Sequence, residues 1–287
     1  MLQKYVEVER EEVPCAICGC IGPILLFEVK GGSLYFGDQR KDLKGLERIV
    51  RCPSCGLVYV NPRLVITAQV TTYSEAEETE YFRSTSPYRS ANYDTLIKMI
   101  ERSKAKGNIL DVGFGDALFL RSAEVRGWAV WGVELRQRLV RSAKERFGLS
   151  NLFEGELGSV TALWPSRFFD VVVLLNVIEH IRHPSQAMAE VERLLKEDGL
   201  VVIHTCNFGG LQARLAGKKW QHFCPFEHLY YFTYDTLKRL LEKNSLRVTG
   251  RFSFKSSSAL KCLVQRVLET GGLYVDNSLG VLASNIG

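Results

Sequence analysis

Between residues 95 and 245, short apolar runs alternate with segments that have the apolar spacing of amphipathic helices. Residues 168–176, FFDVVVLLN, are apolar almost throughout, which is typical of a strand buried on both faces of a sheet. Strands that alternate with helices in this way form a parallel sheet with helices on both sides. The pattern therefore predicts an α/β fold built on a doubly wound sheet.

Acidic residues and glycines stand where two of these strands are expected to end. Asp111 lies two residues before Gly113, and Gly115 follows; Glu134 ends the next apolar run. A dinucleotide fingerprint would need a glycine where Leu118 stands, and a carboxylate repels a pyrophosphate. An acid at the second strand end can instead accept hydrogen bonds from ribose hydroxyls. Unless both are ordinary surface acids, the two carboxylates predict a ligand with a nucleoside at one end and a positive group at the other, as in S-adenosylmethionine.

Two matched C-x-x-C-G motifs occur near the N-terminus. Cys15 and Cys18 form the first pair, and Cys52 and Cys55 form the second. Four thiolates complete the tetrahedral set of a closed structural zinc site, with no position open for water. Strand-like runs, ILLFEV and SLYF, separate the pairs. The alternative, four unrelated buried cysteines, does not explain the repeated motif. We therefore predict a small β-rich zinc ribbon.

The bulk properties exclude several classes of protein. The chain has 287 residues, which suits one large domain and a small one. No apolar run reaches the roughly 18 residues that cross a bilayer, and the charged N-terminus lacks the apolar core of a signal peptide. The net charge of +5 is not gathered into a basic stripe. We expect a cytoplasmic protein without a nucleic-acid partner; nothing in the sequence sets its oligomeric state.

Four motifs in the order ILDVGFGDALFL, WGVELR, FFDVVVLLNVIEHIRHP and LLKEDGLVVIHT resemble those of class I S-adenosylmethionine-dependent methyltransferases. The resemblance covers roughly residues 95–245 and implies a Rossmann-like methyltransferase sheet that ends in an antiparallel strand, GVLASNIG. It implies that Glu156 lies near the adenine and that Asn176 faces the methionine moiety. The residues implied to bind the cofactor are Asp111, Gly113, Phe114, Gly115, Asp116, Glu134, Glu156 and Asn176.

The segments CAICG, RCPSCGLVYVNPR and WQHFCPFEHLYYFT make the chain similar to a zinc-ribbon subgroup of bacterial methyltransferases. That subgroup resembles sugar C-methyltransferases and other enzymes of surface-glycan or secondary-metabolite pathways. The resemblance implies that Tyr73 and Tyr81 cover the cofactor. It also implies that an acid–histidine pair, Glu227 and His228, removes a proton from the acceptor.

Histidines are the candidate general bases, because methyl transfer to a hydroxyl or a carbon acid needs a proton acceptor besides accurate positioning. His228 and His180 are the candidates, and Glu227 would assist His228. Each histidine has a structural alternative: His228 could cap the following helix or pack under aromatic side chains, and His180 could order the loop before Pro184. His204 lies within a strand pattern, so we expect it to be buried.

These patterns divide the chain into three parts. We expect a zinc ribbon at 1–65, a cofactor-covering linker at 66–94 and the methyltransferase domain at 95–287, with an acceptor-site insert at 207–232. A helix is expected at 258–269, SALKCLVQRVLE.

The expected enzyme methylates a small molecule or a glycan precursor, such as a sugar, a nucleotide-sugar or a secondary metabolite. One alternative is an RNA methyltransferase whose ribbon binds RNA, although LLNVIEH stands where base-amine methyltransferases carry an NPPY-type signature. The other alternative is a non-catalytic module that binds the cofactor.

Overall fold

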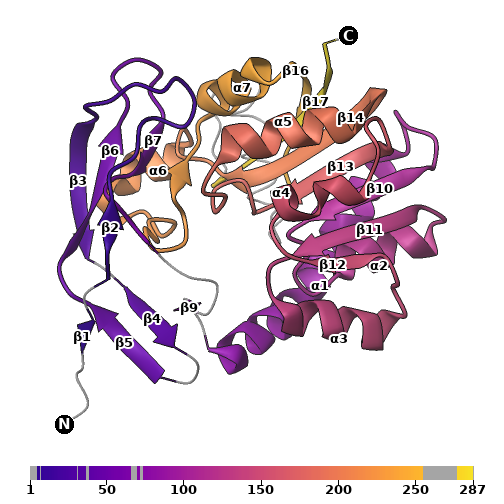
Figure 1. Ribbon diagram of the computed structural model, residues 1–287, viewed down its shortest axis with the longest axis horizontal. Helices are drawn as coiled ribbons and strands as arrows, with labels where there is room; N and C mark the ends of the chain where they lie inside the picture. Colours follow the sequence, from indigo (N-terminus) through magenta and orange to yellow (C-terminus); the bar gives the residue numbers. More distant parts are fainter. Residues whose placement is uncertain are drawn as a thin grey trace.

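The computed structural model places most of the chain in an α/β region and a β-rich N-terminal region (Figure 1). The residues that the structure describes are 5–6, 8–30, 32–36, 39–65, 70–71, 74–254 and 277–286. Tyr73 and the helix expected at 258–269 lie outside them. Among the described residues, no helix is both long enough and apolar enough to cross a membrane.

The α/β region is built on a seven-stranded sheet with the order β12-β11-β10-β13-β14-β17-β16. Its strands are β10 Asn108–Val112, β11 Ala129–Glu134, β12 Leu152–Glu154, β13 Phe169–Leu175, β14 Leu195–Cys206, β16 Leu246–Phe252 and β17 Ser278–Asn285. The first five strands in this order are parallel, and β17 is inserted antiparallel between β14 and β16. The predicted doubly wound sheet and its final antiparallel strand are both confirmed.

Helices cover both faces of this sheet. They are α1 Glu75–Ile100, α2 Leu118–Val125, α3 Gln137–Phe147, α4 Leu157–Val160, α5 Pro184–Leu194 and α7 Tyr234–Lys243, with the 3-10 turn η1 Thr161–Leu163. Helix α6 Leu211–Ala216 and the 3-10 turn η2 Gly217–Lys219 belong to the insert, and Ala213 of α6 packs instead in an apolar cluster with Ile49 and Val58 of the N-terminal region. Along β13, Val171 and Val173 pack into one apolar cluster with α1 and α2, while Val172 and Leu174 pack into another with α5 and α7. Burial on alternate faces, at about 1.5–3 kcal/mol per side chain, explains the unbroken apolar run.

Helix α1 differs from the expected helix at 95–106, because it begins at Glu75 and ends at Ile100. Ser74 caps its first turn by accepting a hydrogen bond from the Glu77 backbone, and the Glu77 side chain accepts one from the Ser74 backbone. This capping box satisfies backbone N–H groups that an isolated helix end leaves without partners. Residues 75–94 of the expected linker therefore belong to this helix.

The N-terminal region contains three small sheets, with strand orders β1-β5-β4-β9, β15-β7-β6-β3 and β2-β8. Their strands are β1 Tyr5–Val6, β2 Arg10–Glu11, β3 Ile24–Lys30, β4 Ser33–Phe36, β5 Gln39–Leu43, β6 Leu46–Arg51, β7 Val58–Val60, β8 Arg63–Leu64, β9 Val70–Thr71 and β15 Tyr230–Tyr231. Strand β15 belongs to the 207–232 insert, yet it pairs antiparallel with β7. The insert therefore completes a sheet of the N-terminal region, beside which α6 also lies in Figure 1.

Tyr230 joins the two regions through its ring and its hydroxyl. The ring stacks on Tyr59 with centroids 6.5 Å apart. The hydroxyl donates to the Arg182 carbonyl at 3.0 Å and accepts from Arg63 Nη1 at 3.3 Å. Arg63 also donates directly to the Arg182 carbonyl at 2.7 Å. The N-terminal region and the α/β region consequently share buried polar contacts as well as a strand pairing.

Tyr230→Phe is expected to lower the free energy of unfolding by about 1 kcal/mol, because it removes two partly redundant buried hydrogen bonds and keeps the ring. Urea unfolding followed by fluorescence measures the change. Tyr88→Phe is the control, because Tyr88 is exposed on α1. Equal stabilities of the two variants would show that the Tyr230 hydroxyl does not join the regions.

Candidate active site

The loop after β10 approaches the neighbouring strand ends closely. Gly113 and Gly115 have φ values of +70° and +58°, a region that favours glycine. The Gly113 N–H donates to the Val133 carbonyl at 2.7 Å, and a Cβ on Gly113 would lie 2.6 Å from Val177 Cγ2. The left-handed backbone at both positions therefore favours glycine. The absence of side chains there also lets the loop pass close to a ligand.

Two buried carboxyl groups stand at the ends of β10 and β11. Asp111 is 2% exposed and Glu134 is 6% exposed. Burial raises the pKa of both, and the charges of Glu134 and Asp116 raise the pKa of Asp111 further. Glu134 Oε2 accepts from the Gly115 N–H at 3.0 Å, and Oε1 accepts from the Arg136 N–H at 3.1 Å. Each oxygen keeps capacity for another donor, such as a sugar hydroxyl.

The first half of α1 packs over the glycine loop. Arg89 donates from Nη1 to Asp116 Oδ1 at 2.7 Å and from Nη2 to Oδ2 at 2.6 Å. Its guanidinium lies 5.0 Å from the centroid of the Phe82 ring, and that ring would be 3.2 Å from a Cβ on Gly115. Tyr81 is adjacent but 55% exposed. Sequence reasoning missed Phe82 and Arg89, because neither belongs to a recognised motif.

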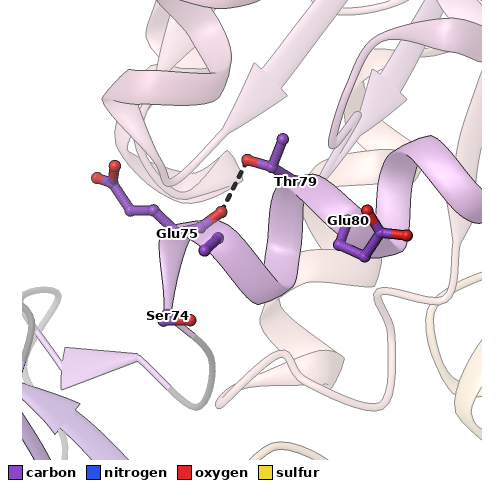
Figure 2. Close-up of a pocket in the computed structure, with 5 residues that line it drawn as sticks. Ser74, Glu75, Thr79 and Glu80 are labelled. Carbon is purple, nitrogen blue, oxygen red and sulfur yellow. Dashed lines mark hydrogen bonds between the residues drawn. The ribbon is translucent and has the colours of Figure 1, made fainter.

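Salt bridges also connect the start of α1 with the segment that follows β11. Glu78 is buried on α1 and pairs with both Arg136 and Arg138. Figure 2 shows the neighbouring first turn, where Thr79 donates a hydrogen bond to the Glu75 carbonyl at 2.7 Å. The shallow pocket there is lined by Ser74, Glu75, Ala76, Thr79 and Glu80. None of these residues stands at a strand end, so this pocket lies outside the candidate site.

Asn176 follows β13 and is held by β14. Its backbone is left-handed, with φ +56°, and its N–H donates to the His204 carbonyl at 2.7 Å. His204 Nδ1 lies 3.0 Å from Asn176 Oδ1 and can donate to it. His204 is buried, as expected, and burial lowers its pKa to about 4, so the ring is neutral. The Asn176 side chain is therefore oriented at the end of the sheet.

The other two predicted cofactor residues lie in different surroundings. Glu156 is exposed between β12 and α4, where it is the N-cap residue. Phe114 is buried in the apolar core, and a Cβ on Gly132 of β11 would lie 2.6 Å from its ring. The predicted cofactor residues thus share one edge of the sheet, but their side chains do not all face the same space.

The structure brings the candidate bases His180 and His228 together, with ring centroids 4.9 Å apart. His180 Nδ1 donates to the Glu227 carbonyl at 3.0 Å, and His228 Nδ1 donates to the His222 carbonyl at 2.9 Å. Burial lowers the pKa of His180 to about 4 and that of His228 to about 3, so both rings are neutral at physiological pH. Protonation of His180 would lower the pKa of His228 further, because the two rings are adjacent.

Glu179 is a third member of this group that sequence reasoning missed. Its side chain is 1% exposed, and burial raises its pKa to about 7. Its backbone carbonyl accepts hydrogen bonds from the Leu229 N–H at 2.8 Å and the Tyr230 N–H at 3.2 Å. These bonds hold the start of β15 against the loop after β13. They explain why His180 and His228, distant in sequence, become neighbours.

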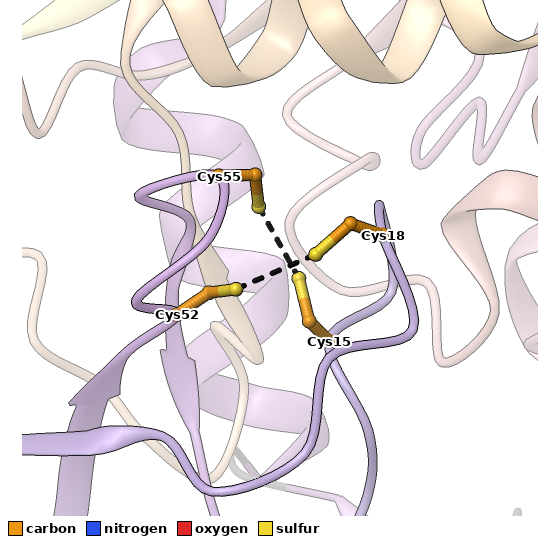
Figure 3. Close-up of side chains that lie close together, drawn as sticks. All are labelled: Cys15, Cys18, Cys52 and Cys55. Atoms are coloured by element: carbon orange, nitrogen blue, oxygen red, sulfur yellow. Dashed lines mark hydrogen bonds between the residues drawn. The ribbon is translucent and has the colours of Figure 1, made fainter.

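The four predicted cysteines also come together, as Figure 3 shows: their side chains point from two loops toward a common centre. Cys15 Sγ lies 3.4 Å from Cys55 Sγ, and Cys18 Sγ lies 3.5 Å from Cys52 Sγ. All four sulfurs are within 4.8 Å of one another. Zinc–sulfur bonds of about 2.3 Å in a tetrahedron require separations of this order. The donor set and its spacing fit a tetrahedral metal ion.

The two cysteine loops have the same backbone structure. The Gly19 N–H donates to the Cys15 carbonyl at 2.8 Å, and the Gly56 N–H donates to the Cys52 carbonyl at 3.0 Å. The two glycines have φ values of +73° and +80°. A left-handed residue closes each turn without steric strain, which explains the glycine in both motifs.

Comparison with known proteins agrees with this architecture. A family model described as a methyltransferase domain matches residues 84–250. An uncharacterized methyltransferase of Geobacillus sp. is 25% identical over 169 residues, which cover 55% of this chain and 78% of that protein. A ubiquinone biosynthesis O-methyltransferase of Nitrosomonas europaea is 30% identical over 102 residues, which cover 34% of this chain. The match spans only 43% of the Nitrosomonas protein.

Solved structures share the fold. A SAM-dependent methyltransferase from Archaeoglobus fulgidus aligns with a TM-score of 0.52 at 17% identity, covering 71% of this chain and 98% of that one. An S-adenosylmethionine-dependent methyltransferase from Clostridium acetobutylicum aligns with a TM-score of 0.52 at 12% identity, covering 74% and 99%. At these identities the likeness concerns the fold, a mostly parallel seven-stranded sheet, to which the present chain adds a β-rich region with a cysteine cluster.

Proposed function

Because this chain belongs to the methyltransferase-domain family and is an S-adenosylmethionine-dependent methyltransferase, we propose that it methylates a small molecule or a glycan precursor. Sugars, nucleotide-sugars and secondary metabolites form the proposed acceptor class. The observation that carries the proposal is the placement of His228, from the 207–232 insert, beside His180 after β13. We propose that this insert forms one wall of the acceptor site, the acceptor wall. Relatives named for ubiquinone biosynthesis serve the synthesis of a small molecule, which favours an acceptor of that size.

We assign the cofactor to the edge of the sheet where β10, β11 and β13 end. Asp111 would balance the ammonium of the methionine end, because a cation relieves the cost of a buried carboxylate. Glu134 would accept hydrogen bonds from the ribose hydroxyls. Asn176 would face the methionine moiety, and Glu156 would lie near the adenine. The complete proposed set is Asp111, Gly113, Phe114, Gly115, Asp116, Glu134, Glu156 and Asn176.

Methyl transfer then proceeds by in-line displacement. A lone pair of the acceptor attacks the methyl carbon, the bond from carbon to sulfur breaks, and S-adenosylhomocysteine leaves as a neutral thioether. An oxygen or carbon acceptor also loses a proton, for which we propose His228, Glu227 and His180. Because Nδ1 of each ring donates to a carbonyl, Nε2 of His180 and His228 is the nitrogen that can accept.

We also propose that Cys15, Cys18, Cys52 and Cys55 hold a structural zinc ion. Four thiolates leave no position for water or substrate, so the ion would stabilise the fold and take no part in methyl transfer. Cys15 and Cys52 lie in the same apolar cluster as Tyr230 of the insert. The ribbon would therefore support the acceptor wall through the core. The division of the chain into 1–65, 66–94 and 95–287 and its cytoplasmic location remain predictions.

Transfer of a labelled methyl group tests the acceptor class. The enzyme is incubated with methyl-labelled S-adenosylmethionine and, separately, with the low-mass fraction and the RNA fraction of a bacterial extract. We expect label in the low-mass fraction, and a lower rate for His228→Gln at unchanged affinity for S-adenosylhomocysteine. Label in the RNA fraction alone would establish the RNA methyltransferase alternative instead.

A further inference from the structure

We propose that Glu179, His180 and His228 form a second metal site that binds a divalent transition-metal ion, separate from the four-cysteine cluster. Each residue offers one ligand atom, and the three atoms lie within 4.8 Å of one another. Bonds to zinc-like ions are about 2.0–2.2 Å for imidazole nitrogen and carboxylate oxygen. Atoms bonded to one tetrahedral ion at these lengths lie about 3.4 Å apart, so side-chain movements of about 1 Å would bring the three atoms to a common ion.

The histidine rings are oriented as metal ligands are. A backbone carbonyl can only accept, so the contacts of His180 Nδ1 with the Glu227 carbonyl and of His228 Nδ1 with the His222 carbonyl place the ring N–H on Nδ1. Nε2 then carries the lone pair in both rings. Ligating histidines commonly donate their other N–H to a carbonyl in this way, which fixes the tautomer and the orientation of the ring.

The carboxylate supplies an independent observation. Glu179 is 1% exposed, and its Oε2 makes no hydrogen bond of ordinary geometry among the described residues, although the Thr205 hydroxyl and the Cys206 N–H lie close to the carboxyl group. A buried polar atom without a partner costs free energy, and a cation would supply the missing interaction. The hydrogen bonds from Leu229 and Tyr230 to the Glu179 carbonyl already hold the His228 segment in place. These bonds keep the two histidine segments together, so the remaining change on binding an ion would be in the side chains.

The donor set indicates which ion would bind. Two imidazole nitrogens with one carboxylate oxygen suit zinc, iron, cobalt or manganese, whereas calcium and magnesium prefer oxygen ligands. Three protein ligands also leave coordination positions open, unlike four thiolates. The two sites thus differ in chemistry: the cysteine cluster is closed, and the Glu179 site can bind a further ligand.

The consequence for catalysis rests on the proposed function. An acceptor hydroxyl bound at an open position would lose its proton to water more readily, because a metal ion lowers the pKa of a coordinated oxygen. The oxygen lone pair would then attack the methyl carbon as the carbon–sulfur bond breaks. Because the ion would occupy Nε2 of both rings, metal binding would replace the direct proton transfer to His228 and His180 that is proposed above for the metal-free protein.

Metal stoichiometry tests the site without reference to activity. Protein with zinc in the cysteine cluster is titrated with Co²⁺, and bound metals are counted by elemental analysis after gel filtration. We expect one Co²⁺ per chain in addition to the zinc, with a nitrogen–oxygen spectrum that lacks a sulfur-to-metal charge-transfer band. His228→Gln and Glu179→Gln should each weaken Co²⁺ binding by at least about 100-fold and retain the zinc.

His222→Gln is the matched control, because its ring neighbours His228 while only its backbone carbonyl contacts the site. It should bind Co²⁺ as the wild type does. No Co²⁺ beyond the zinc in the wild type, or equal binding by His228→Gln, would overturn the proposal even if Glu179→Gln failed to fold. Methyl transfer to a small molecule at the full rate by protein without a second metal would overturn the catalytic role of the ion and leave the proposed function standing.

Discussion

Glu134→Gln is expected to weaken the binding of S-adenosylhomocysteine by about 10- to 100-fold. In the wild type both carboxylate oxygens accept backbone N–H groups, from Gly115 and Arg136. An amide must turn its NH₂ toward one of these donors, which disrupts the loop, and it loses the charge that strengthens hydrogen bonds from ribose hydroxyls. Isothermal titration calorimetry measures the change directly.

Two controls separate lost binding from lost folding. Glu145→Gln removes an exposed carboxylate from α3 and should bind S-adenosylhomocysteine normally. The thermal midpoint of unliganded Glu134→Gln should fall by only about 5 °C, because one of the two backbone hydrogen bonds to this side chain is lost, and the variant should remain folded at the temperature of the titration. Unchanged affinity in Glu134→Gln would place the ribose elsewhere.

Cys52→Ser is expected to release the metal ion from the four-cysteine cluster and to lower the midpoint of thermal unfolding by on the order of 10 °C. Cys52 is buried in the apolar cluster that also contains Tyr59 and Tyr230. Loss of the ion would loosen β7 and its pairing with β15, so the acceptor wall would be disturbed too. Elemental analysis and differential scanning calorimetry measure the two effects.

Cys20→Ser is the matched control, because Cys20 follows the first cysteine loop but is not one of the four clustered cysteines. It should keep both the metal and the thermal midpoint. A Cys52→Ser variant that retained a full equivalent of zinc would contradict the assignment of the cluster as its site.

The sheet and the acids and glycines at its strand ends were predictable because their sequence signals are local. Residues 168–176 are apolar on both faces of one strand, and only a strand between two helical layers requires that. The acids and glycines stand directly at the strand ends, so Asp111, Gly113 and Glu134 could be placed before their contacts were known. The left-handed φ of Gly19 and Gly56 likewise follows from two repeated motifs.

Other features depend on contacts between distant segments. The first half of α1 is polar, so from the sequence Glu78 would be interpreted as an exposed acid. In the structure Glu78 is buried and pairs with Arg136 and Arg138, which follow a distant strand. Strand β15 has only two residues, and its partner β7 lies in another region of the chain. Glu179 was missed for a similar reason, since its backbone carbonyl binds Leu229 and Tyr230, which are distant from it in sequence.

Native mass spectrometry of the wild-type protein mixed with S-adenosylhomocysteine tests the central assignment most directly. The assignment predicts one S-adenosylhomocysteine bound per chain, on protein that already contains a zinc ion, and loss of the nucleoside adduct in Glu134→Gln. Absence of a nucleoside adduct at saturating S-adenosylhomocysteine, with the zinc ion in place, would contradict the assignment of the strand ends as a cofactor site.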